Sequence, residues 1–113
     1  MRIYIAGPYS ADTSEQKRLN ILRARNACAD LYRKGHTPFC PHTMTAWFDY
    51  NYPDIPKSRY LETDLEWLGL CDAVLLLPGW EGSEGAQEER LYAIVSEIYT
   101  YYSLDEVPDA NAD

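Results

Sequence analysis

The chain has 113 residues, a formal net charge of −8 and three cysteines. Its length predicts one domain with a core of its own. The acidic balance argues against a nucleic-acid polymer as partner, because no basic stripe is present to displace counterions. No apolar run reaches membrane-spanning length, and MRIYIAGPYS at the N-terminus predicts a strand rather than a signal peptide. The odd cysteine count lacks framework spacing and indicates a reducing compartment, so we expect a cytoplasmic protein without membrane association.

The first third of the chain predicts a strand, a helix and a second strand. Residues 3–6 form a short apolar run, and residues 15–34 place apolar side chains at near-helical spacing. Gly35 supplies the stop of this helix. Residues 37–40 predict a second strand, and Pro38 within it favours the edge of the sheet.

The segment 41–57 is rich in aromatic residues and proline and predicts a long loop, with one helical turn near 43–48. Long structured loops in compact domains are usually functional. A helix is predicted to follow at about 58–70.

The last third predicts a buried strand at 73–77, a glycine-rich loop, a helix at about 84–98 and a final strand at 99–103. Strands that alternate with helices predict a parallel sheet with right-handed crossovers. We therefore expect one doubly wound α/β domain, flavodoxin-like or Rossmann-like, over residues 1–104 with strand order 2-1-3-4. Residues 105–113 predict an acidic, frayed tail.

The glycine-rich loop is the strongest local indication of a ligand site. It follows a buried strand and so lies at the carboxyl edge of the sheet, where open α/β sheets bind ligands. Gly82 and Gly85 let the backbone turn closely, and Ser83 is a candidate N-cap of the helix that follows. A helix N-terminus offers free N–H groups to an anion. Ordinary helix capping explains the same pattern without a ligand.

Two acids are expected at the same edge of the sheet. Asp64 lies in the first half of a helix that runs antiparallel to the strands and therefore begins at their carboxyl ends. Glu88 and Glu89 occupy the first turns of the next helix. Two carboxylates that face one pocket suit glycosidic-bond chemistry, in which one is the nucleophile and the other an acid or base. Alternatively, these acids only complement the helix dipoles.

Three further residues are candidates for ligand contact. Tyr9 and Trp80 could stack on a base, and His42 could contact a base or a phosphate. Packing or dimer contacts for the aromatic residues, and a solvated loop position for the histidine, are the alternatives. The spacing of His36, Cys40 and His42 matches no common zinc pattern, so no metal is expected there.

Three segments together carry a family resemblance. They are IYIAGPY at 3–9, DLEWLGLCDAVLLL at 64–77, and S-x-G-x-x-x-E at 83–89 followed by Ala93. In this order they resemble the nucleoside 2-deoxyribosyltransferase superfamily, including the 2′-deoxynucleoside 5′-monophosphate N-glycosidases and small members of unassigned function. The resemblance implies cleavage or transfer at the N-glycosidic bond of a nucleoside or nucleotide, through a covalent glycosyl-glutamate intermediate and without a cofactor.

The resemblance also implies roles for individual residues. Glu89 matches the nucleophile, Tyr4 the tyrosine that orients it, and Asp64 the acid that assists departure of the base. Ser83 stands where the N-glycosidase branch binds a 5′-phosphate; a serine at a helix N-terminus accepts a dianion, whereas an aspartate repels it.

Gly7 and Gly85, in the loops after the first and third strands, complete the predicted substrate-binding set with Tyr9, Trp80 and His42. The competing hypothesis is a non-catalytic nucleotide-binding or sensing module on the same fold. A redox flavodoxin-like protein fits the sheet order but would need a Ser/Thr-rich phosphate loop after the first strand. An exposed sheet edge, ten tyrosines and three tryptophans predict a homodimer or higher homo-oligomer.

Overall fold

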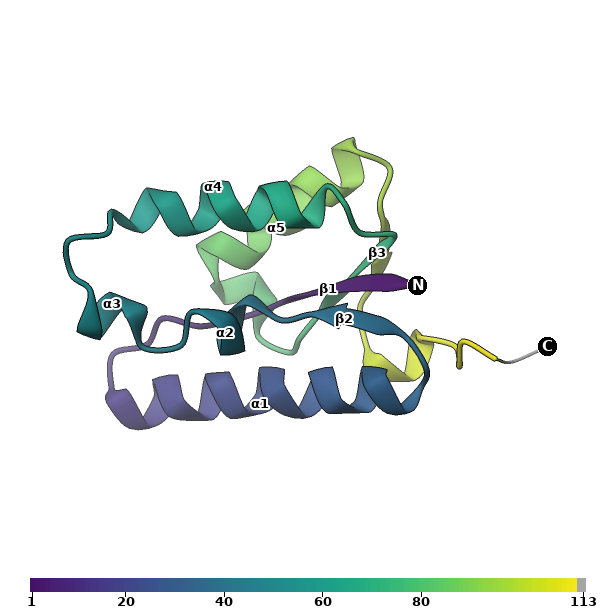
Figure 1. The fold of residues 1–113 in the computed structure, drawn as a ribbon, viewed down its shortest axis with the longest axis horizontal. Coiled ribbons are helices and arrows are strands. Elements are labelled where there is room, and N and C mark those ends of the chain that lie inside the picture. The colour runs from purple at the N-terminus through teal and green to yellow at the C-terminus, as the bar shows by residue number, and fades with distance from the viewer. Residues whose placement is uncertain (112–113) are drawn as a thin grey trace.

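A computed structural model describes residues 1–111 and contains a four-stranded sheet between helices (Figure 1). The strands are β1 (Arg2–Ala6), β2 (Thr37–Phe39), β3 (Ala73–Leu76) and β4 (Tyr99–Tyr101). They pair in the order β2-β1-β3-β4, and every pair is parallel. The predicted doubly wound α/β class and strand order are confirmed, and β2 lies at an edge as Pro38 indicated.

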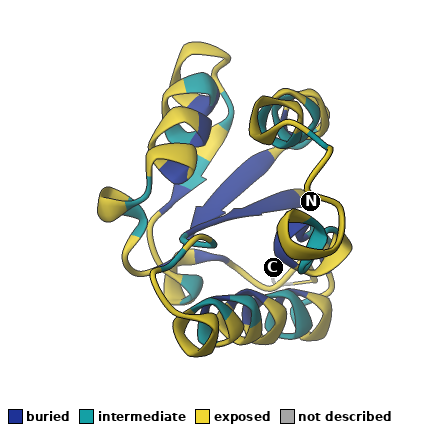
Figure 2. Ribbon diagram, turned by 90° about the vertical axis from the view of Figure 1, so that its left-hand side faces the viewer, coloured by how far each residue is buried: buried dark blue, intermediate teal, exposed yellow. Residues whose placement is uncertain are grey.

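The helices form a layer on each face of the sheet. The longer helices are α1 (Ser14–Arg33), α4 (Lys57–Leu68) and α5 (Glu84–Val95); the short ones are α2 (Pro41–Met44), α3 (Phe48–Asn51), η1 (Trp80–Gly82) and η2 (Leu104–Glu106). α1 covers one face, and α4 and α5 cover the other (Figures 1 and 2). No helix within residues 1–111 is both long and apolar enough to cross a membrane.

Alternation along β1 decides which residues meet which layer. Successive strand residues point to opposite faces. Ile3 and Ile5 therefore pack into the core between the sheet and α1. Tyr4 and Ala6 pack into the core on the opposite face, with Leu68 of α4 and the inner side of α5. A tyrosine consequently stands in the centre of the sheet, on the face that α4 and α5 share.

Two segments differ from the sequence prediction. The 41–57 segment contains two short helices rather than one turn, and Trp47 between them has a left-handed backbone with φ 64°. α5 ends at Val95, short of the predicted 98, because Glu97 adopts φ 60°. The Ile98 N–H then reaches the Ala93 carbonyl at 2.8 Å, which is a Schellman closure with glutamate in the usual place of glycine.

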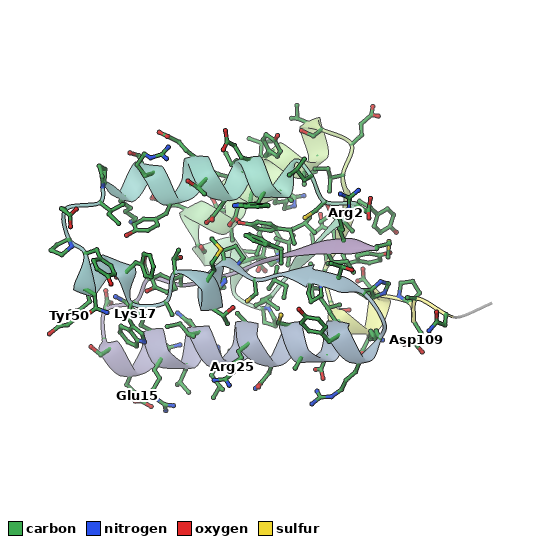
Figure 3. The ribbon with its side chains drawn as sticks, viewed as in Figure 1. Arg2, Glu15, Lys17, Arg25, Tyr50 and Asp109 are labelled. Carbon is green, nitrogen blue, oxygen red and sulfur yellow. The ribbon has the colours of Figure 1, made fainter. Side chains whose placement is uncertain are left out.

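The predicted fraying after residue 104 is wrong for residues 105–111. Val107 is 1 % exposed and belongs to the core on the α1 side. The Lys34 ammonium at the end of α1 donates to the Val107 carbonyl at 3.0 Å, and the Ala110 N–H donates to the Lys34 carbonyl at 2.8 Å. The buried valine and these hydrogen bonds together dock the polar segment against the helix, and Figure 3 shows Asp109 beside the end of α1. Residues 112 and 113 of the predicted tail lie outside the described residues.

Candidate active site

The sheet order fixes where a ligand crevice forms. The crossover from β1 passes through α1 on one face, and that from β3 passes through α5 on the other. The chain thus leaves the neighbouring strands β1 and β3 in opposite directions, and the carboxyl ends of such strands are where open α/β sheets bind ligands.

The loops after β1 and β3 pack tightly against each other at this edge. A Cβ atom on Gly7 would lie 2.8 Å from the Leu77 Cβ atom, so only glycine fits there. Gly79 has φ 90°, and a Cβ atom on it would lie 3.2 Å from the Pro8 ring. Gly7, predicted to bind substrate, thus has a packing role that sets the spacing between the two loops.

Tyr4, Asp64 and Glu89 come together on the face covered by α4 and α5. Glu89 is 8 % exposed and lies on the inner side of α5 with Ala86 and Ala93, which are one helical turn away in each direction. Asp64 lies on α4, and its charge raises the pKa of both Tyr4 and Glu89. Three separate elements therefore supply three ionisable groups to one place.

The two carboxyl groups have unequal pKa values. Burial raises the pKa of Glu89 to about 8; the Tyr4 phenol opposes this shift, while the charges of Asp64 and Glu88 add to it. Burial alone raises the pKa of Asp64 to about 6. Carboxyl groups whose environments push their pKa values apart are the usual sign of an acid–base pair.

The Tyr4 hydroxyl is a buried donor that faces these acids. Burial, and next the charge of Glu89, raise the pKa of the phenol well above its ordinary value, so the hydroxyl keeps its proton. It interacts with Glu89 but meets normal hydrogen-bond geometry with no group of residues 1–111. The ring is held by Phe39 at a centroid distance of 5.8 Å, which limits its movement.

Ser83 caps α5, as predicted. Its hydroxyl oxygen accepts a hydrogen bond from the Ala86 N–H at 3.3 Å. The hydroxyl proton stays available to an acceptor, because the capping bond uses only the oxygen. Gly85, in the first turn, has nothing within 4 Å of the place where a Cβ atom would be, so the helix start is open on that side.

Trp80 packs against two residues of the protein itself, Arg90 and Tyr102. The Arg90 guanidinium lies 5.1 Å from the centre of its ring, and the Tyr102 ring lies 6.0 Å away. Arg90 also donates from Nε to the Tyr102 hydroxyl at 3.0 Å. A cation above an indole ring is a stable arrangement, so the packing alternative describes Trp80 in this structure.

His42 is buried, and the alternative of a solvated loop histidine is wrong. Its Nε2 lies 3.1 Å from the Gly7 carbonyl and 3.0 Å from the Pro8 carbonyl. Since a carbonyl oxygen only accepts, Nε2 donates to both, and burial lowers the pKa of the ring. The side chain thereby holds the loop after β1 in place at the carboxyl edge of the sheet.

Tyr9 joins the first loop to the aromatic segment. Its hydroxyl donates to Asp49 at 2.7 Å and accepts from the Trp47 N–H at 2.9 Å. Burial, and next the bond to Asp49, raise the pKa of Tyr9 to about 12. Lys17 of α1 pairs with Asp49 at 2.6 Å, at the end of the molecule where α1 begins and α3 lies (Figure 3). Tyr9 is therefore a bridging residue whose hydroxyl is already occupied.

Sequence reasoning missed Lys17, Asp49 and Tyr60. The first two form contacts between segments far apart in the chain, which no local pattern reveals. Tyr60 had a usable signal, because it precedes Asp64 by four residues on one helix and so shares its face. Within residues 1–111, no three His, Cys, Asp or Glu side chains are grouped to hold a metal ion.

These features define a small doubly wound α/β domain with one buried and one half-buried carboxyl group on one face of its sheet. The chain belongs to the family described as a domain of unknown function, DUF7768, whose model matches residues 1–103. A search of curated proteins found no match.

Proposed function

We propose that the protein cleaves or transfers at the N-glycosidic bond of a (deoxy)nucleoside or its 5′-monophosphate. The observation that carries this proposal is a pair of carboxyl groups beside Tyr4, the half-buried Asp64 and the buried Glu89, whose pKa values are raised to about 6 and about 8. Cleavage of a glycosidic bond needs one carboxylate to attack and one carboxyl group to supply a proton. The sequence resemblance assigns these same two residues to those roles.

In the first step, a Glu89 carboxylate oxygen bonds to C1′ of the sugar. The bond between C1′ and the base nitrogen breaks, and its electron pair leaves with the base. The base receives a proton from the Asp64 carboxyl group or through water. The product of this step is a glycosyl ester of Glu89 and a free base.

In the second step, water or a second base attacks C1′. The new bond to C1′ forms as the ester bond to Glu89 breaks, and Asp64 takes the proton that the attacking group loses. Glu89 is again a carboxylate and Asp64 is again an acid. Water as acceptor gives hydrolysis, and a second base gives transfer.

The reaction requires the form of the pair that holds one proton. At neutral pH the pKa values favour a single proton, held in the ligand-free protein mainly by Glu89. The neighbouring Tyr4 phenol stabilises the Glu89 carboxylate, since Tyr4 lowers the pKa of that residue. Tyr4 therefore helps to move the proton to Asp64, where the departing base needs it.

The same protonation state supports a second candidate, a nucleotide-binding or sensing module. A protonated Glu89 is a hydrogen-bond donor and no nucleophile, so the pocket could hold a ligand without attacking it. The two functions differ in one observable: an enzyme consumes the ligand, whereas a sensor returns it intact.

The deciding experiment is incubation with a panel of deoxynucleosides, ribonucleosides and their monophosphates, followed by chromatography for free base. Glu89→Gln should abolish base release and leave ligand binding largely intact, because the amide keeps the shape but is no nucleophile. Glu88→Gln is the matched control and should be mild. If Glu89→Gln turns over substrate within a few-fold of the wild type, the covalent role of Glu89 is wrong.

A further inference from the structure

Three buried polar atoms without a partner in the described part of the chain lie on elements that border the carboxyl edge of the sheet. Among residues 1–111, three buried side-chain polar atoms have no hydrogen-bond partner: the Tyr4 hydroxyl, the Tyr60 hydroxyl and His42 Nδ1. Tyr4 faces the two acids, and His42 holds the loop after β1. Buried polar groups are normally paired, so such a group calls for an explanation. The proposed function gives Tyr4 a role but none to Tyr60.

The position of Tyr60 follows from the geometry of α4. It lies one helical turn before Asp64 and therefore on the same face of the helix. α4 runs antiparallel to the strands, so Tyr60 is nearer than Asp64 to their carboxyl ends. Its phenol is close enough to Tyr9 to raise the pKa of that residue. Tyr60 thus lies near the carboxyl edge of the sheet, on the face of α4 that carries Asp64.

Tyr9 and Tyr60 differ in how their hydroxyls are used. The Tyr9 hydroxyl has two partners within the protein, Asp49 and the Trp47 N–H. The Tyr60 hydroxyl is out of solvent and has none among the described residues. A buried hydroxyl without a partner destabilises the folded chain. At a functional site, a role in binding ligand explains why such a destabilising group is kept.

We propose that the Tyr60 hydroxyl binds the polar edge of the base and so helps to select which base is accepted. This inference rests on the proposed function, in which Asp64 gives its proton to the departing base. The base must then lie against the face of α4 that carries Asp64. Tyr60 is the next residue on that face towards the carboxyl ends of the strands. A phenol both donates and accepts a hydrogen bond, which suits the mixed edge of a nucleobase.

The test compares Tyr60→Phe with the wild type in two measurements. The first is the thermal unfolding of the ligand-free protein. The second is the steady-state kinetics of base release, with the nucleoside or monophosphate that the panel identifies as the best substrate. We expect Tyr60→Phe to unfold at the same temperature as the wild type or higher, because it removes an unpaired hydroxyl. We expect its KM to rise about tenfold with kcat changed only a few-fold, as for the loss of one hydrogen bond.

Two variants serve as controls. Tyr9→Phe removes a hydroxyl that the protein itself uses, so its unfolding temperature should fall. Tyr52→Phe alters an exposed residue at the end of α3 and should change neither measurement.

Each remaining outcome overturns the inference. If Tyr60→Phe lowers the unfolding temperature as Tyr9→Phe does, the hydroxyl serves the fold. If its KM equals that of the wild type, the hydroxyl does not touch the ligand, while the proposed function stands. If the wild type neither releases base from any compound of the panel nor binds one by calorimetry, the proposed function fails and this inference fails with it.

Discussion

Glu89 on α5 and Asp64 on α4 lie on the same side of β1, where burial raises the pKa of Glu89 and the charge of Asp64 raises it further. The two carboxyl groups belong to different helices, and Tyr4 of β1 lies beside both.

The rate of base release should have a bell-shaped pH profile. Below the lower pKa, about 6, both groups are protonated and Glu89 cannot attack; above the upper pKa, about 8, both are ionised and no proton is left for the base. The maximum of kcat/KM should therefore lie at about pH 7. Measured rates that rise steadily from pH 5 to 9 would contradict a one-proton pair.

The coupling itself can be measured in the ligand-free protein. Asp64→Asn removes the charge that raises the pKa of Glu89, so the pKa of Glu89 should fall. An NMR titration of the Glu89 side chain in the wild type and the variant measures the change. An unchanged Glu89 pKa would mean that the two carboxyl groups are too far apart to share a proton.

Stability should decrease as the pH rises towards 8. The folded pKa of Glu89, about 8, exceeds its ordinary value of 4.5. Between these values the native state holds a proton that the unfolded chain has lost, so the free energy of unfolding falls with pH. Asp64 acts in the same direction up to about 6. Above about pH 6 only the proton on Glu89 matters, and the free energy of unfolding then falls by at most about 1.4 kcal/mol per pH unit.

Urea unfolding at pH 6, 7 and 8 measures this slope. Glu89→Gln should flatten it and should be more stable than the wild type at pH 8, because the amide never ionises. Glu88→Gln, on the exposed side of α5, removes only the smallest of the contributions to the Glu89 pKa and should keep most of the slope. Parallel slopes for the wild type and Glu89→Gln would show that Glu89 ionises freely in the folded protein.

Ser83 should make the protein prefer monophosphates over nucleosides. We propose that its hydroxyl and the first N–H groups of α5 receive the 5′-phosphate. One charge-assisted hydrogen bond contributes about 1.5–3 kcal/mol, which corresponds to a preference of roughly tenfold to a hundredfold. Calorimetry with a deoxynucleoside and its monophosphate measures the difference.

The Ser83 variants separate a phosphate ligand from a helix cap. Ser83→Ala should remove most of the preference and, by losing the bond to the Ala86 N–H, about 1 kcal/mol of stability. Ser83→Asp keeps a capping oxygen but should reverse the preference, because it sets like charges together. Equal affinities in the wild type would leave Ser83 as a cap only.

The outer side of α5 and the edge strand β4 should form a contact between two copies of the chain. Leu91, Ile94 and Val95 are exposed on α5, Val95 by 75 %, and Tyr99 is exposed on β4, by 63 % (Figure 2). We propose that this apolar side is buried in a homodimer. Light scattering at micromolar concentration should give a dimer mass for the wild type and a monomer mass for Val95→Glu. Leu22→Glu, on α1, is the control and should stay dimeric; a monomeric wild type contradicts the proposal.

Local patterns were sufficient for the framework of the fold. The sequence predicted a parallel α/β sheet from three local features: the apolar run of β3, the periodicity of α1 and the alternation of strands with helices. The predicted strand order is also the observed one. Ser83 was predicted as an N-cap for the same local reason. The antiparallel course of α4 also predicted that Asp64 and Glu89 lie near one edge of the sheet.

Tertiary structure alone decided how the polar groups are used. The sequence predicted that His42, Tyr9 and Trp80 could meet a ligand, but their actual partners are the Gly7 and Pro8 carbonyls, Asp49, and Arg90. These partners lie between 10 and 40 residues away along the chain, and a pattern read over one or two turns contains no information about them. The same holds for Val107, whose apolar side chain helps to dock a polar segment. The Tyr60 hydroxyl could be recognised as unpaired only once every neighbour within reach was known.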